Sequence, residues 1–190
     1  MNTNEVEYDG LFYKIDSEAK TATLSRSNGS NPVFRQAQVL FDFKIPSVMY
    51  YNDEEYAVIG IDDSAFSECH AFTSVDIPTS VFFMYRAAFF HCKSLKKVII
   101  RGNVTIPWFK GVFNHTNLSD IHWYGDIKEL HCFLNAMVSN ESTAHPDYNA
   151  ITIHIRKDSD AADVADWLEK WTFSNHETGL KVKFKIVKDL

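Results

Sequence analysis

Apolar positions recur at intervals of 23 residues through the central third of the chain. Residues 65–77 read AFSECHAFTSVDI and residues 88–100 read AFFHCKSLKKVII, so Ala, Phe and Cys repeat identically. A third copy continues at residues 118–123, which lie 23 positions after 95–100. Its upstream part is displaced by one residue, because Phe113 follows Phe89 by 24 positions. The chain therefore repeats one structural unit.

Each copy ends in an alternation of apolar and polar residues, which predicts a strand with alternate side chains pointing inward. We predict parallel strands at 73–77, 96–100 and 119–123, lying side by side. Two buried columns should cross them: Val75, Val98 and Ile121, then Ile77, Ile100 and Trp123. At the turns behind the strands, the buried residues should be Phe66, Phe89 and Phe113. One unit cannot bury its own apolar side, so neighbouring units must stack. A period in the twenties with the pattern L-x-x-L-x-L is typical of leucine-rich repeats.

The two ends of the chain depart from this period. Residues 5–26 are interpreted as two strands, with turns at Asp9-Gly10 and at residues 17–20. After Trp123, apolar residues from Leu130 to Val138 have helical spacing, and Asp126 can begin that helix. Alternation at 151–155 predicts a strand. A second helix is predicted from Asp158 to Trp171, followed by a last strand that contains Lys181, Lys183 and Lys185.

These patterns predict an α/β fold: a short leucine-rich-repeat solenoid with a β-rich N-terminal cap and an α+β C-terminal cap. We assign the whole chain, residues 1–190, to a single domain. The N-terminal cap covers residues 1–42, the repeats cover 43–125, and the C-terminal cap covers 126–190. Terminal caps are expected because the open ends of a stack of repeats would otherwise expose apolar surface.

Composition excludes several classes of function. Hydrophobic residues make up 45% of the chain and charged residues 23%, the balance of an ordinary folded protein. The formal net charge of -6 argues against nucleic-acid binding. No apolar run is long enough for membrane insertion. The polar N-terminus predicts that no signal peptide is present, so the protein is intracellular or its signal lies outside this sequence.

Two groups of residues with reactive side chains have both a functional and a structural interpretation. Cys69 and Cys92 occupy equivalent positions in neighbouring units, which permits either a disulfide or two buried thiols. We favour the thiols, because Thr116 fills the same position in the third copy. Glu68, His91 and His115 should form a row on the turn side, which could bind zinc. We favour three solvated turn residues and expect no metal and no cofactor.

Residues 58–69, VIGIDDSAFSEC, and residues 75–81, VDIPTSV, resemble the BspA-like leucine-rich-repeat family. The resemblance covers about residues 43–125. Phe82-Phe83 stands where the family has Ile-Gly, and the third copy lacks the Cys. The resemblance implies a bacterial surface or secreted protein that acts in adhesion and recognition without catalysis, and therefore an extracellular or cell-surface location.

We therefore expect a non-catalytic recognition or adhesion module that binds a protein or a glycan. A structural or self-assembly module is the alternative, and a metal-dependent enzyme ranks third. Residues next to the inward-facing ones must point outward on the concave side. This gives a candidate binding face of Ser74, Asp76, Lys97, Ile99, Arg101, Asp120, His122 and Tyr124. Arg and Tyr are common anchors of binding surfaces.

Overall fold

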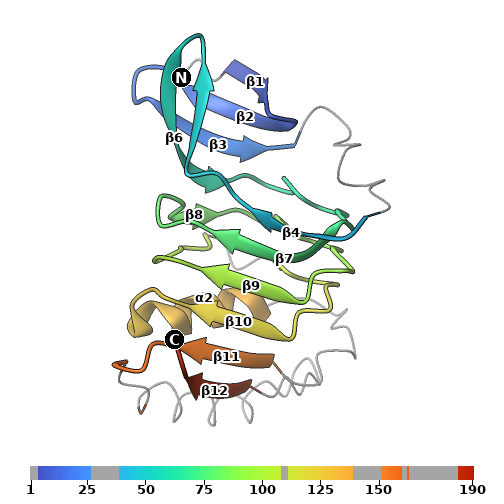
Figure 1. Ribbon diagram of the computed structural model, residues 1–190, viewed down its shortest axis with the longest axis vertical. Helices are drawn as coiled ribbons and strands as arrows, with labels where there is room; N and C mark the ends of the chain where they lie inside the picture. The colour runs from blue at the N-terminus through green and yellow to red at the C-terminus, as the bar shows by residue number, and fades with distance from the viewer. Residues whose placement is uncertain (1–3, 27–38, 108–110, 139–150, 160–161, 163–183) are drawn as a thin grey trace.

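The computed structural model describes residues 4–26, 39–107, 111–138, 151–159, 162 and 184–190. Within these residues the protein is rich in β-sheet, and the longest helical element is the twelve-residue α2. Two six-stranded sheets, here called sheet A and sheet B, contain all the named strands. Figure 1 shows sheet A at the N-terminal end and sheet B running from there to the C-terminus. The predicted α/β class is thus supported in part: the described residues are mostly sheet, with little helix.

Sheet A begins with an antiparallel meander of three strands, β1 (Asn4–Tyr8), β2 (Leu11–Asp16) and β3 (Thr21–Ser25). The prediction of two strands was wrong, because each of the two turns reverses the chain and so separates three strands. Asp9 and Lys20 adopt positive φ at these turns, with Gly10 beside the first. The strand β6 (Glu54–Ile61) pairs with β3 in parallel, and β5 (Val48–Tyr51) pairs with β6. The short β8 (Phe83–Met84) also pairs with β6.

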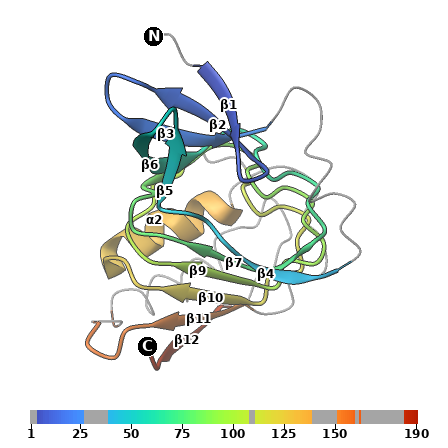
Figure 2. The same cartoon turned by 45° about the horizontal axis from the view of Figure 1, so that its top comes forward.

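Sheet B is parallel throughout, in the order β12, β11, β10, β9, β7, β4. Its strands are β4 (Phe41–Lys44), β7 (Phe72–Ile77), β9 (Lys97–Ile100), β10 (Asp120–Trp123), β11 (Ile151–Ile155) and β12 (Phe184–Lys188). The three predicted repeat strands are confirmed as β7, β9 and β10. The sheet also extends beyond these three strands at both edges, to β4 and to β12. Figure 2 shows these strands along the same side of the molecule.

Across β7, β9 and β10, the register of sheet B follows the 23-residue period. Val75 lies opposite Val98 and Val98 opposite Ile121, and all three side chains are fully buried. Behind the strands, the rings of Phe66, Phe89 and Phe113 form the predicted buried stack. Centroids of successive rings are 5.2 and 5.4 Å apart and the ring planes lie within 13° of each other. Equivalent residues of successive units therefore lie directly above one another in the core.

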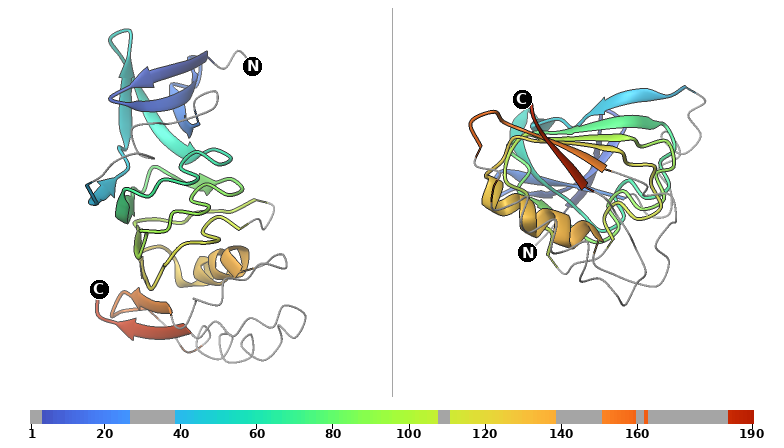
Figure 3. Two further views of the ribbon diagram at one scale, coloured as in Figure 1. Left: turned by 90° about the vertical axis from the view of Figure 1, so that its right-hand side faces the viewer. Right: turned by 90° about the horizontal axis from the view of Figure 1, so that it is seen from below.

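Helix α2 (Ile127–Val138) confirms the predicted first helix after the repeats. The carboxylate of Asp126 accepts the backbone N–H of Lys128 at 2.9 Å, as an N-cap does. Phe133 anchors the helix to the core through Trp123, whose ring centroid is 5.2 Å away. Figure 3 shows α2 on the side of the molecule away from sheet B. Most of the predicted second helix and the first residues of the last predicted strand lie outside the described residues.

Candidate functional site

One surface of sheet B carries side chains in two rows that cross all six strands. We call this surface the outer face. Because paired residues in a parallel sheet point to the same side, the rows follow from the register. The first row is Asp42, Ser74, Lys97, Asp120, Thr152 and Lys185. The second row is Lys44, Asp76, Ile99, His122, His154 and Val187. The two rows mix both charges with imidazole and aliphatic groups.

The structure brings the predicted face residues together and corrects one of them. Asp76, Lys97, Ile99, Asp120 and His122 lie partly exposed in these rows, and Arg101 and Tyr124 follow at the strand ends. Ser74 was predicted to be available on this face, but only 6% of it is exposed. Its hydroxyl donates to the carboxylate of Asp42 at 2.6 Å. The edge strand β4 thus covers the position that the sequence pattern placed in solvent.

Asp42 is held in its charged form by its neighbours in β7. The hydroxyl of Ser74 donates to it at 2.6 Å and that of Thr73 at 2.9 Å. These two hydrogen bonds keep the pKa of Asp42 below its usual value. Lys97, in the next strand, acts in the same direction. This end of the first row therefore presents a fixed negative charge beside a lysine.

At the carboxyl ends of β7, β9 and β10, Asp76, Arg101 and Tyr124 form a continuous group. The Arg101 guanidinium donates to both carboxylate oxygens of Asp76, at 2.9 and 2.8 Å. The same guanidinium lies 5.0 Å from the centroid of the Tyr124 ring, a cation–π distance. Bidentate pairing fixes the orientation of the guanidinium, so this corner of the face is preorganised.

The centre of the second row holds a pair of histidines, one of which the sequence pattern did not select. The ring centroids of His122 and His154 are 4.5 Å apart. His154 Nδ1 lies 2.9 and 3.0 Å from the two carboxylate oxygens of Asp189. Its Nε2 is 3.6 Å from Asp120. Burial, followed by the nearby His154 and Lys97, lowers the pKa of His122 below its usual value. The face therefore holds an imidazole that resists protonation.

The sequence predicts the strand that carries His154, but it predicts neither the place of that strand beside β10 nor the position of Asp189. Alternation at Ile151, Ile153 and Ile155 predicts a strand whose intervening residues share one side. Ile153 follows its sheet neighbour Ile121 by 32 positions rather than 23, so the period does not place the strand beside β10. Asp189 lies beyond the last alternating residues.

The turn side, opposite the strands, carries His91 and His115. The rings of His91 and His115 are 5.8 Å apart, so these two predicted members of the row do lie in sequence along the units. Glu68, His91 and His115 share a positive φ near 60°. No group of three His, Cys, Asp or Glu among the residues that the structure describes is arranged to hold a metal ion. Cys69 and Cys92 are buried, and Cys92 Sγ lies 3.1 Å from the carbonyl oxygen of Phe66.

In the described part of the chain, no helix has the length and apolar character needed to cross a membrane.

No curated protein matches the sequence. Several solved bacterial structures are similar. A leucine-rich repeat protein from Bacteroides capillosus is 26% identical over 62% of this chain and 70% of its own, with a TM-score of 0.41. A leucine rich cell surface protein from Faecalibacterium prausnitzii is 20% identical over 84% of this chain, with a TM-score of 0.44. The pneumococcal vaccine antigen PcpA is 15% identical over 97%, with a TM-score of 0.45.

The chain spans 38% of the length of each of the latter two proteins. The family comparison covers more than half of this chain. Residues 29–139 match the model of the BspA type leucine rich repeat region, in six copies. This confirms the resemblance that the motifs at residues 58–69 and 75–81 indicated. The chain therefore belongs to the BspA-type leucine-rich-repeat family.

Proposed function

We propose that this chain is a non-catalytic recognition module that binds a protein or glycan partner on its outer face. The observation that carries the proposal is the register of that face. Side chains from six parallel strands stand in two rows at the spacing of the sheet. Such rows present donors, acceptors and apolar area in a fixed pattern, which favours a specific partner. Groups mounted on strands also hold their positions better than groups on loops.

The finer architecture belongs to the same proposal. We infer that the repeats stack as a short solenoid, covered at one end by sheet A. An α+β cap that contains α2, β11 and β12 closes the other end. In this arrangement a buried core supports the outer face from behind. We also propose an extracellular or cell-surface location, in keeping with the BspA-type family.

The chemistry of the outer face favours it over the turn side as the docking surface. Arg101 and Tyr124 belong to the residue types that most often dominate binding energy. Asp76 orients Arg101 through two hydrogen bonds, so little side-chain entropy would be lost on binding. Ile99 adds partly exposed apolar area between Asp76 and His122 in the second row.

The test is a binding screen against immobilised extracellular-matrix proteins and a glycan array, followed by variants of the chain. We expect Arg101→Glu and Tyr124→Ala to weaken binding to any partner found. The control Glu68→Lys, which reverses a charge on the turn side, should leave affinity unchanged. Thermal melting of each variant separates lost binding from lost folding. Full affinity in the two face variants, with loss in Glu68→Lys, would place the site on the turn side and refute the proposal.

One observation favours self-assembly as a second candidate function. Val39 and Leu40 directly precede the strand β4, at the edge of sheet B, and are 73% and 56% exposed. Adjacent exposed apolar side chains of this kind can pack against a second chain. Light scattering across a concentration series decides this candidate. A monomer at high concentration would exclude it, whereas a dimer that Leu40→Lys dissociates would support it.

A further inference from the structure

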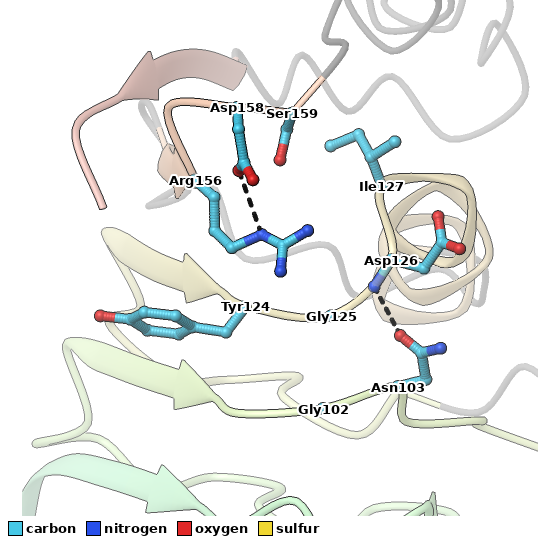
Figure 4. Close-up of a pocket in the computed structure, with 9 residues that line it drawn as sticks. All are labelled: Gly102, Asn103, Tyr124, Gly125, Asp126, Ile127, Arg156, Asp158 and Ser159. Atoms are coloured by element: carbon cyan, nitrogen blue, oxygen red, sulfur yellow. Dashed lines mark hydrogen bonds and ion pairs between the residues drawn. The ribbon is translucent and has the colours of Figure 1, made fainter.

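A pocket of about 490 Å³ lies at the carboxyl ends of β9, β10 and β11, next to the Tyr124 corner of the outer face. Its volume falls within the range of small-ligand sites. Figure 4 shows the Arg156 side chain extending from the end of β11 into the space bounded by Tyr124, Asp126 and Ile127. Tyr124 is the one residue that the pocket lining shares with the binding surface proposed above.

The floor of the pocket is made of backbone from two equivalent turns. Gly102 and Gly125 are 23 residues apart, as are Asn103 and Asp126. A Cβ at Gly125 would lie 2.6 Å from Oδ1 of Asn103 and 2.7 Å from the carbonyl oxygen of Gly102. Oδ1 of Asn103 accepts the backbone N–H of Asp126 at 2.6 Å. The absence of a side chain at Gly125 therefore lets the two turns approach closely, and the Asn103 hydrogen bond ties them together.

The walls carry hydrogen-bonding groups of both kinds. Nε of Arg156 lies 3.4 Å from the Asp158 carboxylate, with 51% of the arginine side chain exposed. Asp126 uses one carboxylate oxygen to cap α2. Ser159 adds a hydroxyl, and Ile127 is the one aliphatic side chain among the described residues of the lining. The pocket is therefore polar, with donors and acceptors close together.

The charged side chains in the pocket lining indicate which class of ligand fits it. An acidic ligand would meet the carboxylates of Asp126 and Asp158, and a cationic ligand would meet the Arg156 guanidinium. An apolar ligand would remove these charged groups from water without offering them hydrogen bonds, which is costly. Hydroxyl groups can donate to the carboxylates and accept from the guanidinium at the same time. Tyr124 supplies an aromatic surface at the edge.

We propose that this pocket binds one neutral sugar residue of a glycan. The inference rests on the proposed recognition function and names its ligand class as a hexopyranose whose hydroxyls bridge Arg156 and the two aspartates. A single sugar held by so few contacts binds weakly, with a dissociation constant in the millimolar range. Tighter binding of a whole glycan would come from further contacts along the outer face.

The test is an NMR titration of the ¹⁵N-labelled chain with methyl glycosides of glucose, galactose, mannose and N-acetylglucosamine. At least one should shift the backbone amides of Gly102, Gly125 and Asp126 saturably. Two charged probes, methyl glucuronide and ethanolamine, should bind about tenfold more weakly, because one charge of the lining opposes each of them. Failure of all four neutral glycosides, equal binding of a charged probe, or shifts located elsewhere would overturn the proposal.

Variants then test the assigned side chains. Arg156→Ala and Asp158→Asn should each weaken binding of the same glycoside about tenfold, the effect of losing one charge-assisted hydrogen bond. Asp126→Asn should do the same while keeping a residue that can cap α2. The control Arg86→Ala removes an exposed arginine that pairs with Asp63 and does not line the pocket. Equal effects of Arg86→Ala and Arg156→Ala would refute the assignment.

The two proposals fail in different ways. If no glycoside binds but Arg101→Glu still weakens a partner, the pocket assignment is wrong and recognition by the outer face stands. If the glycoside binds in the pocket but Arg101→Glu leaves partner binding unchanged, the pocket stands and the outer-face proposal fails. Both measurements use the same full chain.

Discussion

The imidazole rings of His122 and His154 lie on neighbouring parallel strands with their centroids 4.5 Å apart. Burial, His154 and Lys97 together lower the pKa of His122 below the ordinary imidazole value of about 6.5. The unfolded chain, in which His122 has an ordinary pKa, therefore binds this proton more readily than the native chain does. At acidic pH, where the unfolded chain carries more of this proton than the native chain does, the free energy of unfolding is therefore reduced.

The first prediction is a loss of stability on acidification that originates at His122. The part of the folding stability that depends on a neutral His122 is fully present above pH 6.5. It is lost as the pH falls from 6.5 through the lowered pKa of the native state. His122→Gln removes this contribution, so the urea midpoint should change less between pH 7.5 and pH 5 than it does in the unmodified chain. Lys97→Gln should narrow the pH range over which stability is lost, because it removes one cause of the lowered pKa of His122. An unchanged pH dependence in His122→Gln would contradict the assignment.

The second prediction concerns the buried aromatic stack. Phe89 is fully buried, and its ring lies between those of Phe66 and Phe113. Phe89→Ala should lower the free energy of unfolding by about 3–5 kcal/mol, because it removes a buried ring and leaves a cavity. The matched control is Phe82→Ala, since Phe82 is 52% exposed and should cost about 1 kcal/mol or less. Similar melting temperatures for the two variants would show that the stack does not support the core.

The third prediction concerns Gly60 and Phe83, which are paired across β6 and β8. A Cβ at Gly60 would lie 2.0 Å from Cζ of Phe83, so the ring must move to admit a methyl group. Gly60→Ala should therefore destabilise the chain by about 1–3 kcal/mol through overpacking. The same substitution in a Phe83→Ala background should cost much less, since the clash is gone. Equal costs in both backgrounds would mean that the close approach is not the cause.

The fourth prediction concerns thiol reactivity. Cys69 and Cys92 are buried, whereas Cys132 is exposed on α2. Burial also raises the pKa of Cys92, which further slows its reaction as a thiolate. A thiol reagent should modify one cysteine per chain rapidly under native conditions and all three after denaturation without reductant. Cys132→Ser should abolish the rapid reaction. Finding only one thiol in the denatured chain would establish a disulfide and contradict the buried-thiol interpretation.

The pairing of Gly60 with Phe83 also explains the departure of the second repeat from the family motif. Phe83 stands where the motif has Gly, and its ring lies over Gly60 of the preceding unit. The sequence recorded this departure but not its reason. A 23-residue offset places two residues side by side, yet it does not say which one makes room for the other. That choice depends on side-chain packing between units.

The 23-residue offset is enough to identify the units that repeat. A constant offset between Val75, Val98 and the apolar residue at 121 fixes the register of β7, β9 and β10, because equal chain lengths per unit bring equivalent residues together. The same offset placed Asp76, Ile99 and His122 in one row. The same offset also relates Gly102 to Gly125 at the floor of the pocket, which strand alternation alone does not reveal.

The tertiary structure decided what lies beside the repeats. β11 joins sheet B next to β10 although Ile153 and Ile121 are 32 residues apart, and β4 covers Ser74 from the opposite edge. His154 and Arg156 therefore reach the outer face and the pocket from a segment with no periodic relation to either. A local pattern can predict that a strand forms and which of its sides is apolar. Only the matching of buried surfaces across the whole chain selects its neighbour in the sheet, and with it the groups that meet at the site.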